Sequence, residues 1–235
     1  MRRKNVCFVG YGSTEYSRKS EESQLGHYAT AIRAALNQTG LKKKDIHGLS
    51  ITTQASPDTA PHVAEQLGFE LDWVLNADYG GAGGVGAVRR AADAIECGHL
   101  DVALLVGGNS FDRSVAHQRP LEYQRGNFVD VYGYGGPNSL MALIQRLHME
   151  NFGTTLEQIG KIAVAQRFNA MNNPQALFRA PMSMQDYLIS RMISDPIRLF
   201  DCVMPCSGAE CLILASEEKA KQISDKLVYL VTDAE

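Results

Sequence analysis

The fold of this chain of 235 residues is decided by one stretch, Asn76-Ala77-Asp78-Tyr79-Gly80-Gly81-Ala82-Gly83-Gly84. The apolar residues 73–75 precede it and predict a strand. A helix is expected to follow as far as Glu96, because apolar residues recur there at helical spacing, at Val85, Val88, Ala91, Ala92 and Ile95. Glycines at the start of a helix let an anion approach exposed backbone N–H groups. The stretch therefore predicts a strand, a glycine turn and a helix whose N-terminus is open to a ligand.

The same alternation of strand and helix continues outward from this stretch. Strands are predicted over residues 5–9, 49–53 and 102–106, and helices over residues 24–38 and 61–67. Gly40 and Gly98 each follow a predicted helix, where a glycine commonly ends the last turn. This alternation predicts an α/β fold in which helices pack against a sheet.

The pattern changes between about residue 112 and residue 199. No apolar strand is expected there, and helices are predicted over residues 138–151, 155–172 and 183–193. The alternation then returns with a strand at 211–215, a helix at 217–223 and a strand at 227–232. We therefore predict an α/β core formed by residues 1–111 and 200–235, interrupted by a helical domain over residues 112–199.

Composition and charge exclude several classes of protein. Lys and Arg number 23 against 26 Asp and Glu, so no basic face for nucleic acid or an anionic membrane is expected. No apolar run approaches the roughly 20 residues that a membrane span needs. The basic N-terminus is followed by too short an apolar stretch for a signal peptide, and the five cysteines are an odd number. We therefore expect free thiols, a cytoplasmic location and, since Cys and His lack metal-ligand spacing, no metal site.

The glycine run also matches the dinucleotide-binding fingerprint, as Gly81-x-Gly83-x-x-Gly86. That fingerprint requires an acidic residue about 20 positions later, at the end of the next strand. The predicted strand ends instead in Gly107-Gly108-Asn109, and Asp112 follows too late. The run also lies in the third strand–helix unit rather than the first. The sequence therefore disfavours an oxidoreductase with a nicotinamide cofactor.

Several blocks of residues resemble the thiolase superfamily. The predicted central helix and next strand carry Ala82-Gly83-Gly84…Arg90-Ala91-Ala92…Asp101-Val102-Ala103-Leu104-Leu105-Val106-Gly107, which resembles the nucleophile helix and following strand of that superfamily. Later blocks resemble its sterol-carrier-protein or lipid-transfer-protein branch: Gly153-Thr154-Thr155, Ala165-Gln166-Arg167 and Ser190-Arg191-Met192-Ile193. The resemblance implies a layered αβα half of the thiolase fold, with a mainly helical loop domain inserted over an acyl-CoA pocket.

Two departures from the thiolase pattern matter. Thiolases attack with a cysteine at the start of the central helix, and the resemblance places Gly81 at that position, where no acyl group can be carried. Cys206, in Cys206-Ser207-Gly208-Ala209, is the alternative nucleophile, although it precedes a predicted strand rather than a helix. Thiolases also have a second half, so residues 200–235 are expected to lead into a C-terminal half that a longer parent chain or a partner subunit supplies.

Without the cysteine, the resemblance implies a retro-aldol carbon–carbon lyase that acts on a β-hydroxyacyl-CoA, as in steroid or lipid side-chain degradation. Such a lyase needs a base and donors that stabilise an enolate, but no acyl-enzyme. The coenzyme A thioester is then the substrate, and no separate cofactor is expected. Two alternatives stay open: a thiolase-type acyltransferase (acetyl-CoA acetyltransferase), and a non-catalytic acyl-CoA-binding subunit of a thiolase-like complex.

The resemblance also implies site residues and partners. Tyr79 and Tyr134 are the candidate catalytic residues, since a tyrosine can act as acid or base, and the alternative is that they pack on loop glycines. The implied substrate-binding residues are Gly80, Gly81, Gly83, Gly84, Tyr132 and His117. A homodimer is expected, as is a small partner subunit built from a zinc ribbon and an OB-fold.

Overall fold

The computed structural model describes residues 5–52, 58–111, 132 and 136–231. The chain divides into two compact units, one formed by Met1–Phe111 with Cys206–Glu235 and the other by Asp112–Pro205. Each unit is described by itself.

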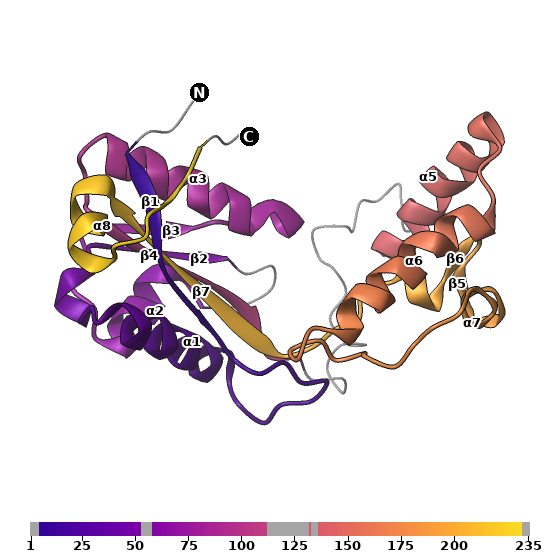
Figure 1. The fold of residues 1–235 in the computed structure, drawn as a ribbon, viewed down its shortest axis with the longest axis horizontal. Helices are drawn as coiled ribbons and strands as arrows, with labels where there is room; N and C mark the ends of the chain where they lie inside the picture. The colour runs from indigo at the N-terminus through magenta and orange to yellow at the C-terminus, as the bar shows by residue number, and fades with distance from the viewer. Residues whose placement is uncertain (1–4, 53–57, 112–131, 133–135, 232–235) are drawn as a thin grey trace. The chain divides into compact units, whose positions relative to one another are not determined.

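The first unit is built on a six-stranded mixed sheet with the order β3-β2-β4-β7-β1-β8 (Figure 1). The strands are β1 (Val6–Ser13), β2 (Gly48–Thr52), β3 (Trp73–Asn76), β4 (Val102–Asn109), β7 (Gly208–Ser216) and β8 (Val228–Tyr229). β2 runs parallel to β3 and β4, whereas β7 is antiparallel to β4 and β1. Consequently β2, β3 and β4 end at the same edge of the sheet at which β7 begins.

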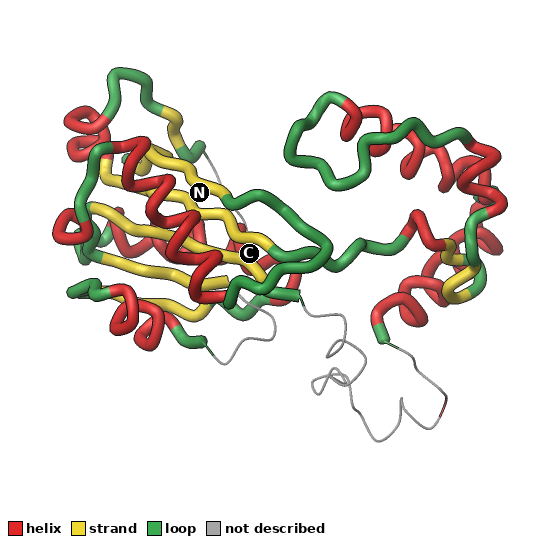
Figure 2. The backbone as a smooth tube through the Cα atoms, turned by 90° about the horizontal axis from the view of Figure 1, so that it is seen from below, coloured by secondary structure: helices red, strands yellow, loops and turns green. Residues whose placement is uncertain are grey.

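Helices cover both faces of this sheet (Figures 1 and 2). On one face, α1 (Gln24–Thr39), α2 (Ala60–Leu67) and α8 (Glu217–Ile223) share a core with alternate residues of the strands. On the other face, α3 (Gly83–Glu96) forms a second core. Its contact face consists of alanines, and Ala87, Ala91 and Ala92 are fully buried, so the helix axis lies close to the strands. The predicted α/β fold, with its layered αβα arrangement, is confirmed.

Local signals place the helix ends of this unit close to where the sequence predicts them. The Ser23 hydroxyl accepts a hydrogen bond from the Gly26 N–H at the start of α1, and Gly40 ends that helix at φ 73°. Thr59 caps α2 in the same way, and the single turns η1 (Lys43–Asp45) and η2 (Gly80–Ala82) precede β2 and α3. Side-chain oxygens satisfy helix N–H groups that have no partner within the helix, and glycine tolerates the left-handed conformation.

The second unit is mainly helical. Its elements are α5 (Pro137–Phe152), α6 (Leu156–Met171), α7 (Met184–Ile189), β5 (Met192–Ser194), β6 (Ile197–Arg198) and the single turn η5 (Leu199–Asp201). Two expectations for this region are wrong, since the helix predicted over residues 183–193 ends at Ile189 and a small antiparallel strand pair follows it. The Ser190 hydroxyl donates to the Tyr187 carbonyl, and that carbonyl also accepts from the Ser190 N–H, which closes the last helical turn. Strands of two or three residues are too short to show a periodic pattern in the sequence.

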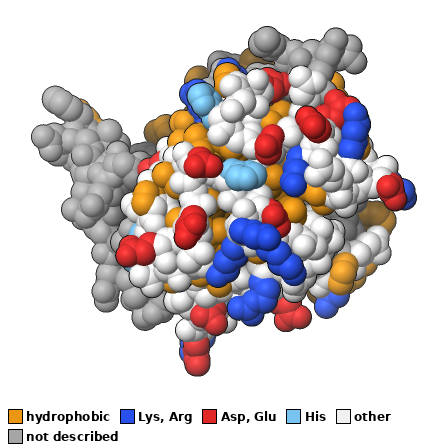
Figure 3. Space-filling model, turned by 90° about the vertical axis from the view of Figure 1, so that its left-hand side faces the viewer, with side chains coloured by type: hydrophobic (Ala, Val, Ile, Leu, Met, Phe, Trp, Pro, Cys, Tyr) orange, Lys and Arg blue, Asp and Glu red, His pale blue; other side chains and the backbone are white. Residues whose placement is uncertain are grey.

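Two surface properties bear on possible partners. Among the described residues, no helix is both long and apolar enough to cross a membrane. On the face shown in Figure 3, acidic and basic side chains both occur and are interspersed with apolar ones.

Candidate active site

The glycine turn lies at the edge of the sheet where β2, β3 and β4 end. Gly80 has φ 58°, in the left-handed region that glycine adopts without strain. A Cβ atom at Gly83 would lie 3.0 Å from the Ala77 carbonyl oxygen, so a larger residue there fits only if the turn moves by a few tenths of an ångström. A Cβ atom at Gly81 or at Gly84 would meet nothing within 4 Å. The turn is therefore tight on the side of the sheet and open on the other side.

The start of α3 has no side-chain cap. Its N-cap residue is Ala82, which has no polar side chain and makes no capping hydrogen bond. The first N–H groups of a helix have no partner within the helix, and they carry the positive end of the helix dipole. The Gly83 N–H donates to the Gly80 carbonyl in η2. The N–H groups that follow it in the first turn of α3, beside the open position Gly84, can stabilise a negatively charged oxygen.

Tyr79 lies directly before the glycine turn, with its ring against the first turns of α3. The Tyr79 ring contacts Gly86, where an added Cβ atom would collide with ring carbons. The Tyr79 side chain is 41% exposed. Tyr132 belongs to the second unit and is almost fully exposed, whereas Tyr134 and His117 lie outside the described residues. A catalytic role for Tyr79 stays a prediction, as do the roles of the other three.

The cysteines are poorly suited to attack a thioester. Burial raises the pKa of the Cys206 thiol, so little reactive thiolate forms near neutral pH. Burial is also the main cause of the raised pKa values of Cys7, Cys202 and Cys211. Cys97 is exposed at the C-terminal end of α3, about 20 Å from the start of that helix. The raised pKa values of four cysteines and the distant position of Cys97 therefore disfavour a cysteine nucleophile.

A row of residues crosses the same edge of the sheet, and the sequence analysis did not anticipate it. Thr52 of β2 pairs with Gly107 of β4, Gly107 pairs with Glu210 of β7, and Glu210 pairs with Ser13 of β1. Thr52 also lies beneath the turn, because a Cβ atom at Gly83 would be 3.5 Å from the Thr52 Cβ. The row therefore links the start of α3 to a carboxylate two strands away.

Glu210 is surrounded by two tyrosines. The Tyr16 hydroxyl donates a hydrogen bond to Glu210 Oε1. Burial raises the pKa of Tyr16, and this hydrogen bond raises it further. The pKa of Tyr11 is also raised, chiefly by the neighbouring Glu210 carboxylate. The available signal in the sequence was a single acidic residue inside an otherwise apolar strand, Gly208-Ala209-Glu210-Cys211-Leu212.

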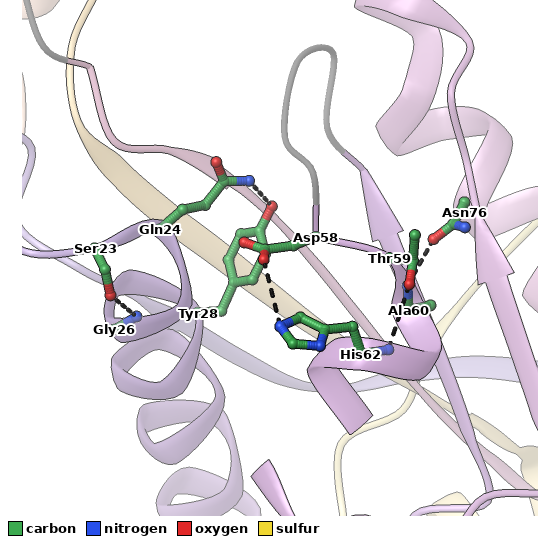
Figure 4. Close-up of polar contacts among 9 residues, drawn as sticks. All are labelled: Ser23, Gln24, Gly26, Tyr28, Asp58, Thr59, Ala60, His62 and Asn76. Carbon is green, nitrogen blue, oxygen red and sulfur yellow. Dashed lines mark hydrogen bonds and ion pairs between the residues drawn. The ribbon is translucent and has the colours of Figure 1, made fainter. Parts of the chain in front are cut away.

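A second polar cluster lies on the opposite face of the sheet, at the N-terminal ends of α1 and α2 (Figure 4). Gln24 donates to the hydroxyl of the buried Tyr28, and His62 faces Asp58 at 3.9 Å between Nε2 and Oδ1. The Ala60 N–H donates to Asn76 Oδ1 over 2.7 Å, which attaches α2 to the end of β3. These contacts cap and position helices.

The second unit has a shallow pocket of its own, about 400 Å³ in volume. Arg167 lines it beside Phe200, and its guanidinium also lies over the Phe178 ring. Within the part of the chain that the structure describes, no group of three or more His, Cys, Asp or Glu is arranged to hold a metal ion.

Comparison with known proteins identifies the relatives of this chain, although no family model matches it. A steroid side-chain-cleaving aldolase from Thermomonospora curvata is 31% identical over 93% of this chain and 58% of that protein. A 17-hydroxy-3-oxo-4-pregnene-20-carboxyl-CoA lyase from Mycobacterium tuberculosis is 31% identical over 98% of this chain and 62% of that protein. An acetyl-CoA acetyltransferase from Methanothermobacter thermautotrophicus is 24% identical over 99% of this chain. The chain thus spans 58% and 62% of the length of the two lyase relatives.

Solved structures agree with these relatives. The Ltp2–ChsH2(DUF35) aldolase superposes with a TM-score of 0.85 and 30% identity, over 95% of this chain and 58% of that one. A monomeric SCP2-thiolase-like protein from Mycobacterium smegmatis superposes with a TM-score of 0.69 at 18% identity, which supports the fold alone.

The predicted resemblance to the lipid-transfer-protein branch is therefore confirmed by homology as well as by fold. The placement of Gly81 at the nucleophile position stays a prediction. This chain is a thiolase-like chain whose homologues are SCP2-type thiolases and steroid side-chain-cleaving aldolases.

Proposed function

We propose that this chain is part of a carbon–carbon lyase that cleaves a β-hydroxyacyl-CoA by retro-aldol chemistry. The observation that carries the proposal is the open glycine at the start of α3. Gly81 offers no nucleophile, and the space beside it is unfilled. Relatives named as an aldolase and as a CoA lyase support the same reaction class.

The reaction needs little from the protein beyond proton transfer and charge stabilisation. A base takes the proton of the β-hydroxyl group, and the β-carbon becomes a carbonyl as its bond to the α-carbon breaks. The electron pair of that bond passes to the α-carbon and the thioester oxygen as an enolate. The α-carbon then takes up a proton, so no oxidant, reductant or acyl-enzyme is required.

The glycine turn supplies the enolate site. We place the thioester oxygen at the uncapped N–H groups of α3, with Gly80, Gly81, Gly83 and Gly84 as the substrate-binding backbone. Fixed N–H donors that meet a developing oxyanion contribute on the order of 10²–10³ in rate. The absence of a side chain at Gly81 leaves room for a branched acyl group.

Acid–base groups and further contacts come from tyrosines in the proposed site. Tyr79, on the glycine turn, and Tyr134 are the candidate proton donors or acceptors, with Tyr132 and His117 as candidate substrate contacts. The coenzyme A thioester is the substrate, and the chemistry needs no separate cofactor.

We also propose that the protein works as a homodimer with a small zinc-ribbon/OB-fold subunit, in the cytoplasm. The solved Ltp2–ChsH2(DUF35) aldolase, whose name includes a second protein, supports the presence of a partner subunit. Light scattering of the purified chain at micromolar concentration tests the dimer, and a monomer under these conditions contradicts it.

Acyl transfer is the second candidate function, because acetyl-CoA acetyltransferases are also among the relatives. That reaction needs a cysteine thiolate, and the raised pKa of Cys206 disfavours it. A non-catalytic acyl-CoA-binding subunit is the third candidate, and it predicts binding without turnover.

The test is cleavage of 17-hydroxy-3-oxo-4-pregnene-20-carboxyl-CoA, the compound in the name of one relative, by the full chain together with its co-purifying partners. Product steroid and shorter acyl-CoA are quantified by liquid chromatography and mass spectrometry. We expect cleavage to survive replacement of all five cysteines by serine. Loss of cleavage in that variant, with its fold retained, contradicts the cysteine-independent mechanism. Binding without cleavage by the native chain supports the non-catalytic subunit.

A further inference from the structure

Glu210 lies on the face of the sheet that α3 covers. Its neighbours in β7 alternate between the two cores: Ala209 and Cys211 belong to the core under α1, whereas Leu212 and Leu214 pack on the α3 side. Successive side chains of a strand point to opposite faces, so Glu210 shares the α3 side with Leu212 and Leu214. The Glu210 carboxylate therefore lies on the same face as the apolar side chains of Leu212 and Leu214.

Its position along the strand brings it level with the proposed enolate site. Glu210 pairs with Gly107, and Gly107 pairs with Thr52, which lies beneath Gly83. Neighbouring strands lie about 4.8 Å apart, so the backbones of Glu210 and Thr52 are roughly 10 Å apart. Gly107 lies between them with no side chain. A substrate that rests on the glycine turn can therefore extend along the row toward Glu210.

A hydrogen bond holds one oxygen of the Glu210 carboxylate but not the other. Tyr16 donates to Oε1, whereas Oε2 is shielded from solvent and has no standard hydrogen bond to any described residue. Burying a carboxylate oxygen without a donor is costly, and such atoms often mark functional sites. Tyr11 pairs with Leu212, so its side chain lies on the same face, and it remains 44% exposed. Tyr11 and Glu210 are therefore diagonal neighbours on the α3 face of the sheet.

We propose that Tyr11 and Glu210 form a proton relay for the carbon–carbon cleavage, in which Tyr11 takes the acid–base role for which Tyr79 and Tyr134 are the other candidates, and Glu210 acts through Tyr11. The role rests on the retro-aldol activity proposed above. Tyr16 is a positioning residue, because its hydroxyl fixes the orientation of the carboxylate.

The proton balance of the relay closes within one turnover. The Tyr11 oxygen takes the β-hydroxyl proton while the Tyr11 proton passes to the Glu210 carboxylate. The carbonyl product forms, and the electron pair of the broken bond enters the thioester enolate. Tyr11 then delivers a proton to the enolate carbon and recovers its own from Glu210. Both side chains return to their starting protonation states.

The chain offers a matched control in a second tyrosine–glutamate pair. The Tyr229 hydroxyl donates to Glu217 Oε1 over 3.1 Å, and Tyr229 pairs with Cys7 near the start of β1, at the opposite end of the sheet. Both pairs join a phenol to a carboxylate, but only the Tyr11–Glu210 pair lies at the edge with the glycine turn. Tyr229→Phe and Glu217→Gln therefore control for loss of a surface hydrogen bond.

The kinetic test measures cleavage of 17-hydroxy-3-oxo-4-pregnene-20-carboxyl-CoA by the full chain with its co-purifying partners. We expect Tyr11→Phe and Glu210→Gln each to lower kcat by about 100-fold or more with little change in KM, since a positioned base contributes about 10²–10⁴. Glu210→Asp, which keeps a carboxylate, should recover part of the loss, and both control variants should retain wild-type kcat. A native chain that cleaves the substrate while Tyr11→Phe keeps full kcat overturns the relay but leaves the lyase standing.

A second measurement decides the relay even if the native chain does not cleave this substrate. Tyrosine ring-carbon NMR follows the titration of each phenol, and the Tyr11→Phe variant assigns the Tyr11 signal. We expect Glu210→Gln to lower the pKa of Tyr11 and Glu217→Gln to leave it unchanged. A Tyr11 titration that Glu210→Gln does not move overturns the relay. Failure of cleavage by the native chain, with that shift present, overturns the proposed substrate and reaction instead.

Discussion

The proposed site requires β2 and β4 to pair with Gly107 directly beside Thr52. Substitution of Gly107 is the most direct test of this packing. A Cβ atom at Gly107 would collide with the Thr52 hydroxyl oxygen, and it would also lie 3.3 Å from the Thr52 carbonyl oxygen. Gly107→Ala therefore forces the threonine side chain or the β2–β4 register to shift. Overpacking of this kind costs about 1–3 kcal/mol. The lower entropy of alanine in the unfolded chain offsets about 0.5–1 kcal/mol of that cost.

The net expectation is a loss of about 0–2.5 kcal/mol in the free energy of unfolding, centred near 1 kcal/mol. Thr52→Ala removes the colliding hydroxyl and leaves the nearest contact at 3.3 Å, which a small backbone adjustment accommodates. The double variant Gly107→Ala/Thr52→Ala should therefore be more stable than the two single losses predict, by about 1 kcal/mol. Gly84→Ala is the matched control, since a Cβ atom there meets nothing within 4 Å and alanine favours the helix.

The assay is urea unfolding at 25 °C followed by tryptophan fluorescence. Trp73 is the single tryptophan of the chain and lies in β3, next to β2, so its signal reports on the first unit. A Gly107→Ala variant more stable than the native chain by more than about 0.5 kcal/mol would refute the packing argument. Strict additivity in the double variant would show that Thr52 is not the residue in collision.

Three further predictions concern the same unit. Ser23→Ala removes the cap on the Gly26 N–H and should lower the free energy of unfolding by about 1 kcal/mol in the Trp73 assay; no change would mean that the cap contributes nothing. Iodoacetamide should alkylate exposed Cys97 faster than Cys206 at pH 7.5, and the Cys206 rate should keep rising above pH 9 because burial raises its pKa. Peptide mass spectrometry measures both rates, and faster labelling of Cys206 contradicts the assignment. Gly81→Cys should fold like the native chain, because the added side chain enters open space, and a loss above about 1 kcal/mol contradicts that geometry.

Local signals were enough to predict most of the fold. Apolar periodicity and helix-ending glycines located α1 and α3, and runs of apolar residues located β4 and β7. The glycine turn was also predicted, because glycines after a strand and before a helix have a local meaning. The pair β5–β6 was missed, since strands of two or three residues have no periodicity to detect.

The sequence by itself determined the α/β alternation, the glycine turn before α3 and the lack of a cysteine at that turn. These three features depend only on residues close together in the sequence and on which residue types occur there. Only the tertiary structure brought Tyr11, Glu210, Gly107 and Thr52 to one edge, because β7 returns between β1 and β4 after the whole second unit. Register between strands is set by packing of both faces of the sheet, so a residue such as Glu210 acquires its partners only when the sheet has formed.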